Sequence, residues 1–483
     1  MSGVPTAVIV LAAGQGTRMK SSRPKVLHEI GGRSLVGHVL HAAAPLGARE
    51  TVVVVGAGRE QVERHLAERF PAARTAVQDQ QLGSGHATRI AVEALGDPSG
   101  TIVVLNGDAP LLTDQTLAGL VAQHDAEGNA MTVLSAEVPN PHGLGRIVRD
   151  GGSVTAIVEQ KDADDQVAAI TEINAGIYVF DGARLAEIMG SFSRDNAQGE
   201  EYITEALTLL LERGAQVGAH VAASYEETLG CNDRIELSER GRQLNDRILR
   251  RWMAEGVTVV DPLTTWVDAD VELARDVTLL PGVHLAGATK ADEGATIGPD
   301  STIRDTEIGA GATVSRTEAL LAVVGPGASV GPFAYLRPKS ILGEGGKIGT
   351  FVETKNADIG AGSKVPHLTY VGDATIGVDT NIGASSVFVN YNGVTKSHTT
   401  IGSHCRLGSD TMYVAPVTIG DGAYSGASTV IREDVPPGAL AVSAGAQHNV
   451  LGWVRKNRPG TAAAEAAAAA EETAPDSEAQ KDS

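Results

Sequence analysis

The sequence predicts two folds joined end to end. The first is an α/β domain with a Rossmann-like, mainly parallel sheet, and the second is a left-handed parallel β-helix built of hexapeptide repeats. Apolar strands that alternate with helical stretches predict the first fold up to about residue 232. Apolar residues at every sixth position predict the second fold from residue 257 onward. The 57 glycines agree with the β-helix, because small residues fill the corners of its coils.

Composition narrows the possible partners. Hydrophobic residues make up 42% of the 483 residues, which is enough for real cores, and the length suggests more than one domain. The net charge of −20 argues against a nucleic-acid surface, so a phosphate site must be a local basic pocket. No apolar run approaches the roughly 20 residues of a membrane span, and the N-terminus is a strand rather than a signal peptide. Two cysteines are too few for a disulfide framework, so we expect a cytoplasmic protein with no membrane partner.

Strands and helices of the N-terminal half alternate along the chain. Strands are predicted at residues 8–11, 51–55 and 101–105, and helices at residues 34–44 and 61–69. In such sheets a ligand binds beyond the carboxyl ends of the parallel strands. The first and third strands are followed by glycine turns, which therefore fall at the ligand edge.

A glycine turn follows the first strand directly. Gly14 and Gly16 allow backbone N–H groups to approach a ligand closely, and Arg18 and Lys25 add positive charge. This pattern predicts a phosphate cradle. An ordinary strand–turn–helix is the alternative, since a lone Gly-x-Gly is a weak signal. The fixed spacing of Thr-Arg-Met after the second glycine and of Pro-Lys further on favours the cradle.

The β-helix is predicted from three runs of apolar residues spaced six apart. The runs are Ile359, Val365, Val371; Ile376, Ile382, Phe388; and Ile401, Leu407, Tyr413, Ile419, Ser425, Ile431, in which only the serine is not apolar. About 18 residues per coil gives roughly ten coils, stacked about 4.8 Å apart. Residues 389–397 interrupt the period and are expected to loop out of the stack. A β-sandwich with glycine turns is the alternative, but its strands do not keep a six-residue register.

A connecting helix is expected between the two folds, over residues 234 to about 253. Leu244, Ile248 and Trp252 fall four apart on one face, and the helix would be about 30 Å long. The tail is alanine- and glutamate-rich, and we expect it to be mostly disordered with some nascent helix at residues 462–471. The expected boundaries are 1–233, 234–256, 257–459 and 460–483.

The motifs LAAGxGTRM and PKVLH, followed by a hexapeptide β-helix, resemble a known family over roughly residues 5 to 455. This family is the bacterial bifunctional UDP-N-acetylglucosamine pyrophosphorylase / glucosamine-1-phosphate N-acetyltransferase. The resemblance implies acetyl transfer from acetyl-CoA to glucosamine 1-phosphate. It also implies Mg²⁺-dependent uridylyl transfer from UTP to N-acetylglucosamine 1-phosphate, which supplies cell-wall precursors such as those of peptidoglycan. It further implies a homotrimer.

The resemblance assigns a nucleotidyl site to the N-terminal half. The nucleophile is a phosphate oxygen that is already anionic, so charge neutralisation by Arg18 and Lys25 would suffice without a general base. Asp108, which follows the third strand, and Asn232 would hold Mg²⁺, an ion that takes few protein oxygens. On spacing alone, Asp108 could be a plain turn aspartate. Gln78 would offer uracil a donor–acceptor pair. The nucleotide and sugar contacts implied by the family are Leu11, Ala12, Gly14, Lys25, Gln78, Gly83, Ser84, Gly145, Glu159, Asn174 and Asn232.

The resemblance assigns an acetyltransferase site to the β-helix. An ammonium is not a nucleophile, so a proton must leave, and His367 matches the family's general base, with Glu353 expected to orient its ring. Arg337 and Lys355 would clamp the sugar phosphate. The implied glucosamine-phosphate contacts are Arg337, Lys355, Tyr370 and Asn381, and the implied acetyl-CoA contacts are Ala384, Asn390, Tyr391, Ser409 and Ala427.

One position departs from the family. Many members have an arginine that helps to hold CoA where this chain has Ala444, so the family's contact is in doubt there. Arg455, Lys456 and Arg458 lie just downstream, and we hypothesise that they supply the missing charge.

Two other functions are compatible with parts of the sequence. The chain could be a sugar-nucleotide pyrophosphorylase whose β-helix is only regulatory or oligomerising. It could also be a non-catalytic interaction protein built on two ligand-binding folds. The acetyltransferase residues argue against the first alternative, because a scaffold does not need all of them. The intact Lys25 and Asp108 argue against the second.

Overall fold

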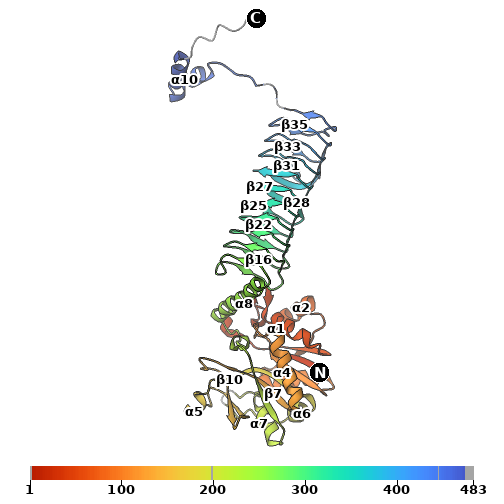
Figure 1. The fold of residues 1–483 in the computed structure, drawn as a ribbon, viewed down its shortest axis with the longest axis vertical. Coiled ribbons are helices and arrows are strands. Elements are labelled where there is room, and N and C mark those ends of the chain that lie inside the picture. Colours follow the sequence, from red (N-terminus) through yellow and green to blue (C-terminus); the bar gives the residue numbers. More distant parts are fainter. Residues whose placement is uncertain (1–2, 197–198, 444, 446, 474–483) are drawn as a thin grey trace.

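The computed structural model describes residues 3–196, 199–443, 445 and 447–473. An α/β body lies at one end of the molecule, and a long β-helix extends away from it, with helix α8 between the two (Figure 1). The fold class predicted from the sequence is confirmed in its two parts, a mainly parallel α/β sheet followed by parallel β-helix ladders. Within the described residues, no helix is both long enough and apolar enough to cross a lipid bilayer.

The N-terminal sheet has nine strands, in the order β11-β7-β10-β6-β1-β4-β5 with the hairpin β8–β9 beside β10. Strand β1 pairs in parallel with β4 and β6, whereas β10 runs antiparallel to β6 and β7. The strands are β1 (Ala7–Leu11), β4 (Glu50–Val55), β5 (Arg74–Val77), β6 (Thr101–Asn106), β7 (Met131–Glu137), β8 (Arg146–Asp150), β9 (Ser153–Val158), β10 (Glu172–Asp181) and β11 (Val217–Val221), and the small hairpin is β2 (Glu29–Ile30) and β3 (Arg33–Ser34).

Helices occur where the apolar periodicity predicted them. The expected helices at residues 34–44 and 61–69 are α1 and α2, and the expected connecting helix is α8. Ser34 caps α1 by accepting a hydrogen bond from the backbone N–H of Gly37. The helices are α1 (Leu35–Ala43), α2 (Arg59–Arg69), α3 (Ser84–Leu95), α4 (Asp114–Glu127), α5 (Asp165–Ala168), α6 (Gly182–Ile188), α7 (Glu205–Glu212), α8 (Arg234–Ala254), α9 (Trp453–Asn457), α10 (Ala462–Thr473), and the short 3₁₀ turns η1 (Thr17–Met19), η2 (Lys25–Leu27), η3 (Ala44–Leu46) and η4 (Tyr225–Thr228).

The β-helix consists of three parallel ladders of short strands. The first ladder is β12 (Thr258–Val259), β15 (Thr278–Leu279), β18 (Thr296–Ile297), β21 (Thr313–Val314), β24 (Ser329–Val330), β27 (Lys347–Thr350) and β29 (Lys364–His367). The second is β13 (Trp266–Val267), β16 (His284–Ala286), β19 (Thr302–Arg304), β22 (Thr317–Leu320), β25 (Ala334–Leu336), β28 (Glu353–Ile359), β30 (Tyr370–Ile376), β31 (Val387–Val389), β33 (Met412–Val414) and β36 (Val430–Ile431). The third shares β28 and β30 and adds β14 (Glu272–Leu273), β17 (Lys290–Ala291), β20 (Glu307–Ile308), β23 (Val323–Val324), β26 (Ser340–Leu342), β32 (Thr399–Ile401) and β34 (Val417–Ile419), and β35 (Tyr424–Ser425) pairs with β37 (Leu440–Ala441).

The predicted six-residue registers are confirmed, because the members of all three runs are buried inside the coils. Successive rungs are 16 to 18 residues apart in most of the stack, as in the pairing of Thr278 with Thr296 and of Thr302 with Glu318. The rung that contains residues 389–397 is longer, since Val387 pairs with Met412. The predicted loop therefore leaves the stack at this coil.

Large side chains occupy one corner of the β-helix, although we expected small ones. Phe333, Phe351 and Leu368 have positive φ angles and are 53%, 59% and 58% exposed. The rings of Phe333 and Phe351 stack with their centroids 5.5 Å apart. The result is an apolar ladder on the surface of the β-helix.

The tail is helical where the sequence predicted nascent helix, at residues 462–471. Residues 462–473 form helix α10. Alanine has the highest helix propensity, and the carboxylate of Glu471 accepts a hydrogen bond from the guanidinium of Arg455 on α9 at 2.6 Å, which joins the two helices. Ala444 and residues 474–483 lie outside the described residues.

Candidate active sites

The glycine turn after β1 lies at the carboxyl edge of the sheet. Gly16 has a φ of 59°, and a Cβ there would lie 2.6 Å from Cβ of Lys25, so only glycine allows this close approach. A Cβ on Gly14 would meet no protein atom within 4 Å. The protein therefore does not require glycine at position 14, but a ligand that contacts the backbone there would.

Three adjoining hollows follow this edge. The first, of about 640 Å³, contains Gln78 and shares Gln15 and Gln81 with the second. The second, of about 460 Å³, contains Arg18 and Lys25 and shares Asn232 with the third. The third, of about 280 Å³, is lined by these predicted site residues: Asp108, Gly145, Glu159, Asn174 and Asn232.

Lys25 and Asp108 form an ion pair where the second and third hollows meet. The Lys25 ammonium contacts a carboxylate oxygen of Asp108, and its Nζ lies 3.4 Å from Oδ1 of Asn232. The backbone N–H of Cys231 donates to the carbonyl of Asp108 at 3.0 Å, which brings Asn232 beside the carboxylate. Two side-chain oxygens thus converge on one cation. This donor set fits Mg²⁺, which takes one or two protein oxygens and completes its shell with phosphates and water.

The third hollow is lined by polar side chains, some of them partly buried. Burial raises the pKa of Glu159, and the nearby carboxylate of Asp162 adds to this effect. The Asn174 amide donates to the hydroxyl of Tyr178 at 2.8 Å, and its oxygen accepts from the backbone N–H of Gly176 at 2.9 Å. These contacts fix the orientation of Asn174 at the wall of the hollow.

Arg146 supports this wall, and no sequence motif singled it out. Its side chain is 1% exposed, and its guanidinium donates to the carbonyl of Leu144 and, at 2.8 Å, to the side-chain oxygen of Gln160. The same Gln160 oxygen accepts from the backbone N–H of Gly143 at 2.9 Å. The buried cation therefore holds the loop that precedes β8 against the end of β9.

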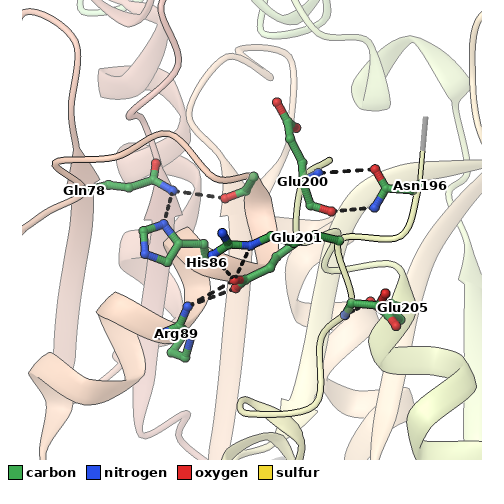
Figure 2. A network of polar contacts seen from close by, with 10 residues as sticks. Gln78, His86, Arg89, Asn196, Glu200, Glu201 and Glu205 are labelled. Carbon is green, nitrogen blue, oxygen red and sulfur yellow. Dashed lines mark hydrogen bonds and ion pairs between the residues drawn. The ribbon is translucent and has the colours of Figure 1, made fainter. Parts of the chain in front are cut away.

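Gln78 does not present the donor–acceptor pair that we expected for uracil. Its side-chain amide donates to the carbonyl of Gly83 and to Nδ1 of His86, both at 3.0 Å (Figure 2). Both amide hydrogens are used, so the carboxamide oxygen is the group left for a ligand. The partners of this buried amide are set by the loop at the start of α3, which the sequence analysis did not take into account.

The segment around Glu201 packs against that loop. The carboxylate of Glu201 accepts hydrogen bonds from Arg89 and Arg194, and these outweigh the effect of burial and lower its pKa (Figure 2). A Cβ on Gly83 would lie 2.4 Å from the carbonyl oxygen of Glu201, which explains the glycine. The hydroxyl of Ser84 accepts from the backbone N–H of Ile203 at 3.1 Å. The side chain of Ser84, which was predicted to contact the nucleotide, thus stabilises the packing of the Glu201 segment against the start of α3.

Glu200 lines the second hollow beside Lys25 and was missed by the sequence analysis. It lies far along the chain from the glycine turn and belongs to no motif. Leu11 and Ala12 were predicted at this edge, and they form the end of β1 and the first residue after it.

The predicted residues of the second site lie on neighbouring coils. Glu353 pairs with Tyr370 in the second ladder, whereas His367 ends β29 in the first ladder. The expected contact from Glu353 to His367 is absent among the described residues. Instead, the Glu353 carboxylate accepts a hydrogen bond from Arg337 at 2.8 Å, because these two side chains lie on adjacent rungs of one face. This pairing raises the pKa of Arg337.

Lys396, on the loop that leaves the stack, was also missed. Its ammonium lies close to that of Lys355, and this repulsion lowers the pKa of Lys355. The carboxylate of Asp373 accepts hydrogen bonds from Asn356 at 2.8 Å and from Asn390 at 2.5 Å. Lys355 and Lys396 help these amides to keep the pKa of Asp373 low, against the effect of burial. The loop thus completes a polar cluster that begins on β28.

Small residues predicted for the acetyl-CoA groove stack along one edge. The backbone N–H of Asp410 donates to the carbonyl of Ala384 at 2.7 Å, and that of Ser428 donates to the carbonyl of Ser409 at 2.8 Å. Ser409 immediately precedes the donor Asp410, and Ala427 immediately precedes the donor Ser428 on the next coil. Elsewhere, Asn381 bridges the backbones of the coils above and below it, and the exposed Tyr391 donates to the carbonyl of Gly393 at 2.6 Å.

The fold and the first site define a nucleotidyltransferase-type α/β domain fused to a hexapeptide β-helix. The family of MobA-like NTP transferase domains matches residues 8–170. Over 466 residues, the chain is 60% identical to the bifunctional protein GlmU of Streptomyces avermitilis, with 96% of this chain and 97% of that protein covered. It is 59% identical to bifunctional protein GlmU of Streptomyces coelicolor and of Thermobifida fusca, each over 468 residues, 96% of this chain and 97% of the relative. The chain therefore belongs to the GlmU family of bifunctional proteins.

Proposed function

We propose that this chain makes UDP-N-acetylglucosamine in two steps, at two separate sites. Residues 1–233 carry out uridylyl transfer, residues 257–459 carry out acetyl transfer, and residues 234–256 connect them. The observation that most supports this assignment is the meeting of Lys25, Asp108 and Asn232 at the junction of the second and third hollows. We place these reactions in the cytoplasm, where the substrates UTP and acetyl-CoA are used.

The three hollows correspond in order to base, phosphates and sugar. The first hollow receives uracil against the Gln78 oxygen. In the second, Arg18 and Lys25 neutralise the triphosphate, and the backbone at Gly14 contacts it. The third hollow receives N-acetylglucosamine 1-phosphate. Its phosphate oxygen attacks the α-phosphorus of UTP, a new P–O bond forms, and the bond to the β-phosphate breaks to release pyrophosphate.

Magnesium fits the first site. Asp108 and Asn232 would hold it, and when bound it supplies further positive charge to the phosphates. Asp108 also holds the ammonium of Lys25, which keeps this cation at the junction between nucleotide and sugar phosphate. The hydroxyls and N-acetyl group of the sugar meet Glu159, Asn174 and the backbone at Gly145.

Acetyl transfer takes place on the β-helix. His367 takes a proton from the amine of glucosamine 1-phosphate, whose nitrogen attacks the thioester carbon of acetyl-CoA. A C–N bond forms, the C–S bond breaks, and the sulfur of CoA leaves and receives a proton. Arg337, Lys355 and Lys396 bind the sugar phosphate. An anion between the two lysines relieves the repulsion that lowers the pKa of Lys355.

Product analysis tests both activities together. The purified protein is mixed with glucosamine 1-phosphate, acetyl-CoA, UTP and Mg²⁺, and each component is left out in turn. We expect UDP-N-acetylglucosamine only in the complete mixture. Without UTP, the expected product is N-acetylglucosamine 1-phosphate. If no N-acetylglucosamine 1-phosphate formed without UTP, while added N-acetylglucosamine 1-phosphate was uridylylated, the β-helix would be a scaffold only.

A second prediction concerns the missing CoA-binding arginine. The double variant Arg455→Ala, Lys456→Ala is expected to raise the KM for acetyl-CoA by about 10-fold, the effect of losing a charge-assisted contact to phosphate. Arg455 is already paired with Glu471, so Glu471→Ala is expected to lower this KM by freeing the guanidinium. An unchanged KM in the double variant would show that the charge comes from elsewhere.

A third prediction concerns assembly. We propose a homotrimer in which the apolar ladder of Phe333, Phe351 and Leu368 is covered by another copy, beside His367. Sedimentation velocity is expected to give a trimer for the wild type and a smaller species for the double variant Phe333→Asp, Phe351→Asp. An active wild-type monomer would contradict this proposal.

A further inference from the structure

A cavity of about 320 Å³ lies where α1, the start of α4, helix α8 and the first coil of the β-helix meet. None of the residues assigned above to uridylyl or acetyl transfer lines it. Its wall includes Arg33 from β3, Arg247 and Arg251 from α8, and Ala269 from the first coil. The cavity thus lies at the junction between the two halves of the chain.

The charged groups of this cavity are mainly cations. Asp114 is the carboxylate that lines it, against three guanidinium groups. Arg33 is already paired with Asp270 of the first coil. Among the described residues, no carboxylate lies within ion-pair distance of Arg247 or Arg251. The side chain of Arg251 lies instead over the ring of Trp252, with its guanidinium carbon 4.3 Å from the centroid.

Arg247 is the half-buried cation of the cavity that lacks a carboxylate partner among the described residues. It donates one hydrogen bond, to the neutral carbonyl of Leu111 at 2.7 Å. Burial lowers its pKa, and the more distant carboxylate of Glu227 offsets only part of this effect. Glu227 is itself occupied by the hydroxyls of Thr113 and Thr116, at 2.8 and 2.6 Å. Arg247 is half-buried, and among the described residues its guanidinium has no hydrogen-bond partner other than the Leu111 carbonyl, so its remaining N–H groups are free to bind an anion in the cavity.

The two histidines of the cavity do not alter this balance near neutral pH. His38 is buried and donates from Nε2 to the carbonyl of Ile30 at 2.8 Å, and burial lowers its pKa to about 4. Burial likewise lowers the pKa of His41. Both rings are therefore mainly neutral, and the positive charge of the cavity comes from arginines, which stay charged at any physiological pH.

We propose that this cavity is a binding site for a small phosphate-class dianion, either inorganic phosphate or a phosphate monoester with a short polyol. Guanidinium groups recognise phosphate through paired hydrogen bonds, and the volume leaves room for a small organic group. The proposal does not depend on the reactions assigned above. It has a consequence for them, because Pro110 and Leu112 in the wall belong to the segment that leads from Asp108 to α4. The bound anion therefore ties α8 to the segment that positions Asp108.

Selenate, a dianion with anomalous scattering, locates the site directly. Crystals of the full-length protein are soaked in sodium selenate, and anomalous difference maps are compared for wild type, Arg247→Met and Arg250→Met. Arg250 is exposed on α8 and does not line the cavity, so Arg250→Met is the matched control. We expect a peak beside Arg247 in wild type and control, and none there in Arg247→Met. The absence of this peak in wild type, at a concentration that fills the Lys25 site, would overturn the proposal.

Titration calorimetry in solution identifies the class of ligand. Inorganic phosphate and glycerol 3-phosphate are titrated separately into Arg250→Met, Arg247→Met and Arg251→Met. We expect one site per chain fewer in Arg247→Met, and about 10- to 100-fold weaker binding at that site in Arg251→Met, because one charge-assisted contact is lost. Tighter binding of glycerol 3-phosphate supports a phosphate ester, and tighter binding of phosphate supports the free ion. Equal numbers of sites in Arg247→Met and Arg250→Met for both ligands would refute the proposal.

Discussion

Replacing Asp108 with asparagine is expected to lower uridylyl transfer by at least about 10²- to 10³-fold, the usual effect of removing one preorganised electrostatic contact. Asparagine has nearly the same size and can still accept a hydrogen bond from Lys25, so the fold should persist. The negative charge that holds the Lys25 ammonium, and that would hold Mg²⁺, is lost. Initial rates of UDP-N-acetylglucosamine formation from UTP and N-acetylglucosamine 1-phosphate measure the effect.

Acetyl transfer by the same Asp108→Asn protein is an internal control for folding. The two sites lie on different folds, so this rate is expected to match the wild type. Asp150→Asn removes an exposed carboxylate of the same domain and is expected to leave both rates unchanged. Equal loss of both activities in Asp108→Asn would indicate misfolding, and unchanged uridylyl transfer would remove Asp108 from the site.

The strands, the glycine turn and the β-helix could be predicted because their signals are local. Each depends on residues within a few positions of one another, such as the apolar run of β1 or the six-residue spacing that places Val365 and Val371 on adjacent sides of one coil, both facing its interior. The family motifs in turn placed Asp108, Glu159 and Asn174 together, and the structure puts all three in one hollow.

Contacts set by tertiary packing could not be predicted in this way. Glu200 lies beside the glycine turn because the segment around Glu201 packs against the start of α3. Arg146 donates hydrogen bonds to Leu144, before the β8–β9 hairpin, and to Gln160, after it. The expected contact between Glu353 and His367 was not found in the described part of the chain, for the same reason. Glu353 lies in the second ladder and meets Arg337 of the neighbouring rung, whereas His367 ends a strand of the first ladder. The length of each coil, 16 to 18 residues in most of the stack, sets which side chains meet on one face.

Helix α8 was predicted as a connection, and in the structure it also contributes side chains to a hydrophobic core. Its residues Leu244, Ile248 and Trp252 belong to one continuous core that includes Ile30 of the α/β domain and extends into the first coils of the β-helix. Amphipathic spacing predicts that one face is buried, but it does not say against which partner. The helix therefore packs against both halves, and separation of the domains by a cut within it would expose this core.

Replacing His367 with alanine is expected to lower acetyl transfer by roughly 10²- to 10⁴-fold, the usual contribution of a general base. The ring stands on the exposed side at the end of β29. The backbone carbonyl of His367 is held by the hydroxyl of Thr369 at 2.6 Å and by the N–H of Ser385 at 3.2 Å. These contacts do not involve the imidazole, so the substitution should leave the coil intact. Release of CoA from acetyl-CoA in the presence of glucosamine 1-phosphate measures the rate.

A loss caused by proton transfer can be separated from a loss caused by structure. His404→Ala removes another exposed imidazole of the β-helix and is expected to keep the wild-type rate, because His404 lies outside the proposed site. Uridylyl transfer by His367→Ala should also be unchanged. Added imidazole is expected to restore part of the acetyl-transfer rate, since a free base can enter the space left by the ring. A normal rate in His367→Ala would mean that another group, or water, accepts the proton of the amine, and Glu353 would then be the next predicted residue of the site to test.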